Sequence, residues 1–98
     1  MKATLLQKRR ISYSQDAFAE IVIWTLPTTA TASIHAYKYR LAYVVNGRCM
    51  LRYDNEAGKG DHRHYGLVET PYLYRSLKHL MADFKAGIER WNNENGNL

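Results

Sequence analysis

Residues 34–54, IHAYKYRLAYVVNGRCMLRYD, decide the fold. β-Branched and aromatic residues dominate both halves of this stretch, as they do in β-strands. Asn46 and Gly47 lie between the halves, and this dipeptide is the strongest short-range signal for a two-residue hairpin turn. The stretch therefore predicts two antiparallel strands, over residues 34–45 and 48–54, joined by a tight turn.

The turn also predicts which residues of the hairpin share a face. With a two-residue loop, Val44 lies opposite Cys49 and Tyr43 lies opposite Met50, and opposed residues share a face. Continued outward, this register predicts a core face made of Ala42, Val44, Cys49 and Leu51. The other face, expected to be a working surface or a partner interface, carries Tyr39, Leu41, Tyr43, Met50, Arg52 and Asp54. A bulge of one residue would change this assignment.

The remaining segments predict further strands and one helix. Residues 9–14 and 17–26 have strand composition, and residues 67–74 allow a short final strand. Ser76 is a candidate helix N-cap, and apolar residues follow it at helical spacing as far as Trp91. The sequence therefore predicts an α+β fold, an antiparallel sheet of four to five strands with one C-terminal helix packed on one face. Apolar residues on the other face suggest a partner, either a second copy in a homodimer or another protein.

Length and composition limit the classes of function. A chain of 98 residues predicts a single domain over residues 1–98 with a frayed tail at residues 92–98, too short for a two-domain dinucleotide-binding enzyme. No apolar run approaches the roughly 18 residues of a membrane span. Residues 1–10 contain no apolar signal segment, and the single Cys49 cannot form an internal disulfide. These features predict a cytoplasmic protein without a membrane partner.

Charge and tyrosine content both point towards nucleic acid. Fourteen Lys and Arg against nine Asp and Glu give a net charge of +5, and the chain has eight tyrosines. Basic domains attract polyanions, and aromatic rings stack on bases while cations follow the phosphates. Both features also have structural explanations, because charge aids solubility and tyrosine packs well in sheets. The residues expected to bind RNA are Arg52, Arg63, Tyr39, Tyr43, Tyr65, Lys38 and Arg40.

The densest chemistry lies in residues 52–65, RYDNEAGKGDHRHY. His62 and His64 are two residues apart, so an extended backbone presents both imidazoles on one side. Cleavage of RNA through its 2′-hydroxyl needs a base, an acid and a cation at the phosphate, and histidine suits the first two because it titrates near neutral pH. We expect catalysis to depend on His62, His64, Lys59 and Asp54, with Asp54 orienting a histidine or a cation. This hypothesis requires no cofactor and no metal.

Two other interpretations of the same stretch stay open. His-X-His offers two metal ligands, and Asp54, Asp61 or His35 would supply a third, although zinc sites usually have three or four protein ligands. The polar composition of residues 56–66 is equally typical of an exposed loop. The alternatives to a metal-independent ribonuclease are therefore a metal-dependent nuclease and a non-catalytic module that binds nucleic acid or protein.

Residues 37–66, YKYRLAYVVNGRCMLRYDNEAGKGDHRHYG, resemble the TumE toxins of bacterial and archaeal toxin–antitoxin pairs. The resemblance extends to IVIW at residues 21–24 and to PYLYRSLKHLMADFKAGIERW at residues 71–91. It implies the toxin of a type II pair, which inhibits growth through RNA, and an antitoxin partner with a helix-turn-helix DNA-binding domain. The residues that match the family pattern are Arg52, Asp54, Asn55, Lys59, His62, Arg63 and His64.

Overall fold

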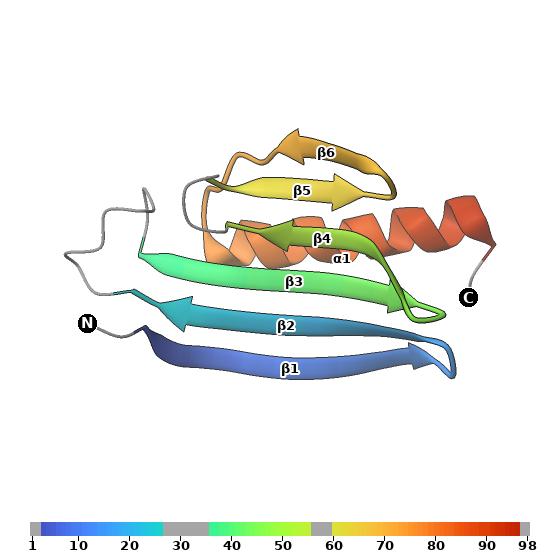
Figure 1. Cartoon of the computed structure of the whole chain (residues 1–98), viewed down its shortest axis with the longest axis horizontal. Helices are drawn as coiled ribbons and strands as arrows, with labels where there is room; N and C mark the ends of the chain where they lie inside the picture. The colour runs from blue at the N-terminus through green and yellow to red at the C-terminus, as the bar shows by residue number, and fades with distance from the viewer. Residues whose placement is uncertain (1–2, 27–35, 56–59, 97–98) are drawn as a thin grey trace.

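The computed structural model describes residues 3–26, 36–55 and 60–96, which form one antiparallel sheet and one helix (Figure 1). The sheet is a meander in which each strand pairs with the next along the chain. The elements are β1 (Thr4–Ser14), β2 (Ala17–Thr25), β3 (Tyr37–Val45), β4 (Arg48–Asp54), β5 (His62–Tyr65), β6 (Val68–Pro71) and α1 (Leu77–Asn95). In this part of the chain, no helix is long and apolar enough to cross a bilayer.

The predicted α+β class, with an antiparallel sheet and one C-terminal helix, is confirmed, but the strand count is wrong. The sheet has six strands because residues 62–65, expected to lie in a loop, form β5 between β4 and β6. Strand β1 also begins at Thr4, well before the predicted start at Arg9. Both differences concern polar segments, which pair with a neighbouring strand without carrying a strong hydrophobic pattern of their own.

The register of the β3–β4 hairpin departs from the predicted one after two pairs. Asn46 and Gly47 have φ values of 52° and 75°, as a type I′ turn requires, and the pairs next to the turn are those expected. Tyr43 then pairs with Leu51, because Met50 is an extra residue that bulges from β4.

The bulge changes which residues of β3 and β4 share a face, because side chains along a strand alternate with a period of two. The predicted burial of Ala42 and Leu51 is confirmed. Three residues expected on a working surface are instead in the core: Tyr39, Leu41 and Tyr43. Cys49, predicted to be in the core, is exposed. Arg52 and Asp54 lie on the face opposite the buried tyrosines, in register with Ala42 and Arg40.

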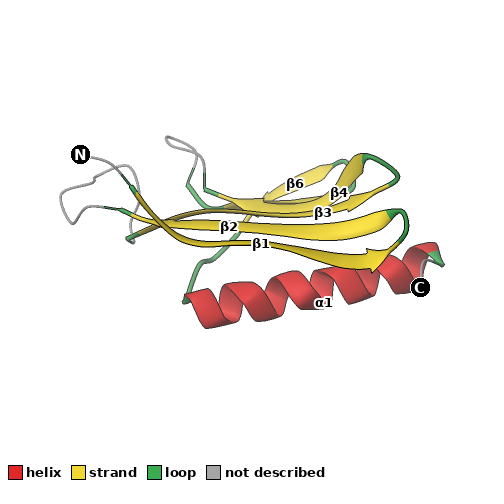
Figure 2. Cartoon of the chain, turned by 90° about the horizontal axis from the view of Figure 1, so that it is seen from below, coloured by secondary structure: helices red, strands yellow, loops and turns green. Residues whose placement is uncertain are grey.

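Helix α1 covers one face of the sheet, which we call the helix face (Figure 2). Ser76 is the N-cap, and its side chain accepts a hydrogen bond from the backbone N–H of His79. The helix buries Leu80, Phe84 and Ile88 against the strands. Gly87 lets it approach closely, since a Cβ at this position would lie 2.7 Å from Cδ2 of Leu51.

The C-terminal end of α1 contradicts the expected frayed tail over residues 92–95. The helix continues to Asn95 and ends at Gly96, which has the left-handed conformation of a C-cap. Asn92 is buried, and its Oδ1 accepts a 2.7 Å hydrogen bond from the hydroxyl of Tyr43. A contact with the sheet therefore holds the last turn of the helix.

The opposite face, which we call the open face, has none of the described elements packed on it (Figure 2). The strand register assigns side chains to this face, because directly paired residues point the same way. Its polar and aromatic residues are Lys8, Arg10, Ser12, Phe18, Glu20, Trp24, Lys38, Arg40, Arg52, Asp54, His62, His64 and Glu69.

Candidate functional site

Five polar side chains meet on the open face where β4, β5 and β6 run side by side; we call them the β4–β6 cluster. Strand β4 supplies Arg52 and Asp54, β5 supplies His62 and His64, and β6 supplies Glu69. In the register, Arg52 is opposite His64, which is also opposite Glu69, and Asp54 is opposite His62. The pairing of three strands thus places these chemically active groups beside one another.

His62 and Asp54 form the buried part of the cluster, with 6% and 3% of their surfaces exposed. Nδ1 of His62 lies 3.1 Å from the carbonyl oxygen of Gly60, and Nε2 lies 2.5 Å from Oδ1 of Asp54. The other carboxylate oxygen of Asp54 lies 2.8 Å from Nε of Arg52. Asp54 therefore holds an imidazole on one side and a guanidinium on the other, which fixes the orientation of both.

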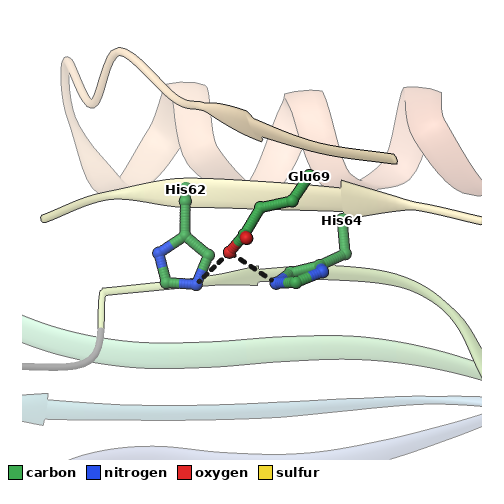
Figure 3. Close-up of side chains that lie close together, drawn as sticks. All are labelled: His62, His64 and Glu69. Carbon is green, nitrogen blue, oxygen red and sulfur yellow. Dashed lines mark ion pairs between the residues drawn. The ribbon is translucent and has the colours of Figure 1, made fainter. Parts of the chain in front are cut away.

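His64 is placed between a hydrogen-bond donor and an acceptor. Its Nε2 lies 2.9 Å from Nη2 of Arg52 and 3.0 Å from Oε2 of Glu69 (Figure 3). Without a proton, Nε2 accepts a hydrogen bond from the guanidinium, and with a proton it donates one to the carboxylate, but it cannot do both. The presence of a proton on Nε2 of His64 therefore selects its partner. The side chain is 28% exposed and that of Glu69 is 48% exposed, so both are accessible to a bound molecule.

A hollow of about 350 Å³ adjoins the cluster. It is lined by Asp61, His62, Glu69, Thr70 and Pro71, from β5, β6 and the residue before β5. Its volume is at the lower end of those of small-molecule sites. A group as small as one nucleotide unit could therefore approach the Glu69 carboxylate from this side.

Three members of the cluster could in principle hold a metal ion. One ligand atom from each of His62, His64 and Glu69 lies within 4.8 Å of the others (Figure 3), and two histidines with one glutamate are a common zinc donor set. However, Nε2 of His64 also touches the Arg52 guanidinium, and Nε2 of His62 is paired with Asp54. A metal ion at this position would therefore compete with Arg52 and Asp54 for the ring nitrogens of the two histidines.

The three tyrosines expected to stack on RNA bases lie on the helix face. Tyr39 and Tyr43 are 2% and 0% exposed, and α1 and its flanking residues cover them. Burial and a 2.7 Å hydrogen bond to Asp61 raise the pKa of Tyr39. Tyr65 donates a hydrogen bond to Glu94 of the helix. The predicted stacking role is therefore wrong for Tyr39 and Tyr43, whose rings are buried, whereas Tyr65 remains partly exposed on the helix face.

The predicted cations are divided between the two faces. Lys38 and Arg40 are exposed on the open face, in the strand next to Arg52. Arg63 instead lines a separate hollow of about 350 Å³ on the helix face, beside Arg90. Lys59, which the sequence predicts to be catalytic, lies outside the described residues, as does the possible metal ligand His35.

Glu69 is the one member of the β4–β6 cluster that is not among the residues predicted from the sequence, although the sequence contains a signal for it. Gly66 has a φ of 61°, and it begins a two-residue turn between the paired residues Tyr65 and Val68. Counting back one position from this turn pairs His64 with Glu69. Residues cannot be paired across this turn when residues 56–66 are expected to form a loop. Next to the Asn46-Gly47 turn, where strands are expected on both sides, the same pairing is predicted correctly for the first two pairs.

Comparison with known proteins agrees with the resemblance found in the sequence. A family model described as Toxin TumE matches residues 2–92, a range that includes all six strands and the whole β4–β6 cluster. No curated protein and no solved structure matches the chain. Because the family model matches nearly the whole chain, the protein belongs to the TumE toxin family.

Proposed function

We propose that this toxin inhibits growth by cleaving RNA through the 2′-hydroxyl, without a metal ion. The observation that carries the proposal is the position of His64 Nε2 between Arg52 and Glu69 on the open face. The reaction needs one group to remove the 2′-proton, one to protonate the leaving 5′-oxygen, and a cation at the phosphate. That nitrogen supplies one of these groups, and the other two lie within hydrogen-bond distance of it.

Glu69 and His64 supply the two proton-transfer groups in this proposal. A carboxyl group is ordinarily ionised at neutral pH, and an imidazole ordinarily titrates there. The Glu69 carboxylate accepts the proton of the 2′-hydroxyl, and the protonated His64 gives its proton to the 5′-oxygen. The 2′-oxygen bonds to phosphorus as the bond to the 5′-oxygen breaks, which leaves a 2′,3′-cyclic phosphate and a 5′-hydroxyl.

Arg52 binds the phosphate that is cleaved. Its Nε is paired with Asp54 and its Nη2 contacts His64, and a guanidinium has five N–H donors in all. The remaining donors can therefore bind phosphoryl oxygens, on which negative charge develops. His62 and Asp54 are positioning residues, because both are buried and together they orient Arg52. This assignment differs from the sequence hypothesis, in which both histidines transfer protons.

The test is cleavage of an end-labelled RNA by the purified protein in excess chelator. We compare the wild type with His64→Asn and Glu69→Gln, and use His79→Asn as the matched control because His79 is exposed at the start of α1. Loss of a general acid or base should reduce the rate at least about a hundredfold. The control should cleave like the wild type. The product ends, a cyclic phosphate and a 5′-hydroxyl, identify the 2′-hydroxyl as the nucleophile.

Three results would contradict the proposal. Cleavage that disappears with chelator and returns with a divalent ion would indicate the metal-dependent alternative. Binding of RNA with no cleavage by any variant would indicate the non-catalytic binding module. Equal rates for the wild type and His64→Asn would exclude the β4–β6 cluster as the centre of the reaction.

Membership of a toxin family implies an antitoxin as partner. We propose further that this antitoxin carries a helix-turn-helix DNA-binding domain and that the pair acts in the cytoplasm. Co-expression with candidate antitoxins, followed by co-purification and a growth assay, tests the partner. Size-exclusion chromatography of the toxin alone tests whether a second copy occupies part of its surface in a homodimer.

A further inference from the structure

We infer that the open face is a track for single-stranded RNA, which crosses the strands from the β4–β6 cluster towards β1. This inference rests on the proposed function, since it assigns the remainder of the substrate that the cluster would cleave. It differs from the sequence prediction, in which tyrosines now found on the helix face would stack on the bases. The RNA-binding residues that it adds are Lys8, Arg10, Phe18 and Trp24.

The cations of the open face are arranged in rows across the sheet. One row runs from Arg52 through Ala42 and Glu20 to Arg10. In the adjacent row, Asp54 is followed by Arg40, Val22 and Lys8. Each row therefore connects the cluster on β4 with a cation on β1, and the cationic side chains of β1 and β3 in these rows are exposed.

The carboxylates on this face lie on β2, β4 and β6, and none lies on β1. Glu20 is opposite Arg10 in the register, but its ion pair, at 3.8 Å, is with Arg40, and Asp54 is bound to Arg52. Among the described residues, Lys8, Arg10 and Lys38 have no carboxylate within ion-pair distance. The distal part of the face therefore keeps positive charge that is not neutralised internally, which is the complement of a phosphate backbone.

Two aromatic side chains accompany these cations, and this favours a single strand over a duplex. The Arg10 guanidinium carbon lies 3.7 Å from the centre of the Phe18 ring, and Nζ of Lys38 lies 5.6 Å from that of Trp24. Unstacked bases bind to aromatic rings and to guanidinium planes, whereas a duplex keeps its base faces inside. Both pairs lie on the sheet face that carries His64.

The width of the sheet limits the length of RNA that the track can hold. Neighbouring strands lie about 4.8 Å apart, so the four steps from β5 to β1 span roughly 19 Å. Sites of this kind hold about four nucleotides at the short end of the observed range. RNA of four to six nucleotides should therefore reach both the cluster and Arg10, whereas a dinucleotide should reach the cluster alone.

The test is binding of fluorescent RNA oligonucleotides, measured by anisotropy in the His64→Asn background so that cleavage does not interfere. In this background we compare Lys8→Ala/Arg10→Ala with the matched pair Lys78→Ala/Lys85→Ala, which removes the same charge from the exposed surface of α1. The Lys8→Ala/Arg10→Ala substitution should weaken hexanucleotide binding about tenfold or more. It should also reduce the slope of log binding constant against log salt concentration by about 1.4, which is about 0.7 for each lost phosphate contact. Dinucleotide binding should not change. Phe18→Leu should weaken hexanucleotide binding about fivefold or more, by removing a stacking surface.

Three outcomes would overturn the inference. The Lys8→Ala/Arg10→Ala and Lys78→Ala/Lys85→Ala variants would lose equal affinity for the hexanucleotide, or the β1 substitutions would weaken dinucleotide and hexanucleotide binding alike. The third outcome is that duplex RNA binds more tightly than the single strand. These outcomes are separate from failure of the proposed function. If the protein binds hexanucleotides through β1 but never cleaves them, the RNA track is supported and the nuclease proposal is contradicted. If Lys8→Ala/Arg10→Ala cleaves RNA and binds hexanucleotides like the protein without these substitutions, the nuclease proposal stands and the track is contradicted.

Discussion

The two faces of the sheet use the same strands for different purposes. On the helix face, tyrosines build the core, and their hydroxyl groups bond to polar groups at the rim of that core. Tyr39 donates to Asp61, and Tyr43 donates to Asn92 of the helix. On the open face, the polar side chains bond mainly to one another across β4, β5 and β6.

This difference shows how the abundance of tyrosine in the chain is to be interpreted. A tyrosine has an apolar body and a polar tip, so it is buried with little cost when the tip finds a partner. Tyr53 shows the same use, because its ring packs edge-on against Phe84 and its hydroxyl donates a hydrogen bond to the carbonyl oxygen of Asp83. The buried tyrosines therefore account for stability, whereas the chemically active groups are on the other side of the same strands.

The largest expected effect comes from the helix face. Phe84→Ala removes a ring that is 2% exposed, and we expect it to lower the free energy of unfolding by about 3–5 kcal/mol. Lys85→Ala is the matched control, because Lys85 is the exposed neighbour of Phe84 and its replacement should change the free energy of unfolding by less than about 0.5 kcal/mol. Urea denaturation of both variants measures the two values. A Phe84→Ala loss as small as that of the control would mean that α1 does not stabilise the sheet.

The second prediction concerns the open face, where Asp54 forms buried ion pairs that should contribute to stability. Asp54→Asn removes the charge that pairs with Arg52 and His62, and we expect the free energy of unfolding to fall by about 1–3 kcal/mol, because two buried polar groups lose their charged partner. Glu20→Gln is the control, because its 3.8 Å ion pair with Arg40 is exposed and should contribute less than about 1 kcal/mol. Similar losses in both variants would remove the distinction between buried and exposed ion pairs on this face.

The third prediction tests the polar tips of the core. Tyr43→Phe deletes the hydroxyl bonded to Asn92 and leaves a buried amide oxygen without that donor, so we expect a loss of about 1 kcal/mol. Tyr13→Phe serves as the reference because its half-buried ring packs on Tyr43. Thermal or urea denaturation compares the two. If Tyr43→Phe were as stable as the wild type, the contact with Asn92 would not hold the end of the helix.

The smallest effect is expected at alkaline pH. Burial, followed by the hydrogen bond to Asp61, raises the pKa of Tyr39, so this side chain ionises more readily in the unfolded chain, where tyrosine titrates near pH 10. Its contribution to stability is therefore fully present below about pH 10 and is lost as the pH rises further. Tyr39→Phe should lose less stability than the wild type between about pH 9 and 11. Part of the loss of stability at alkaline pH should remain in Tyr39→Phe, because burial also raises the pKa of Tyr72. Parallel pH profiles would contradict the assignment to Tyr39.

Local signals explain the parts of the fold that could be predicted. Asn46 and Gly47 form a two-residue turn because few other dipeptides adopt positive φ at both positions. Ser76 begins the helix because its side chain accepts a backbone hydrogen bond of the first turn. Both features depend on residues that are neighbours in the chain, so the sequence shows them directly.

The candidate site could be predicted only in part. Residue types that suit acid–base chemistry, and a spacing of two that places the histidines on one side, predict four members of the cluster: Arg52, Asp54, His62 and His64. Glu69 depends on a second turn and on a four-residue strand, β5, which has no hydrophobic pattern of its own. Its pairing with His64 follows from the turn at Gly66 only once residues 62–65 are known to form a strand.

Residue pattern alone predicts the α+β class, the hairpin turn, the start of the helix and the pair of histidines on one strand face. Which face of the sheet is buried depends instead on tertiary packing. The bulge at Met50 shifts the register by one residue, and a one-residue shift exchanges the faces of a strand. The preferred register is the one that buries Tyr43 and Leu51 under α1, where distant residues pack together. No local pattern in β3 or β4 contains that information, because it depends on the helix that follows them.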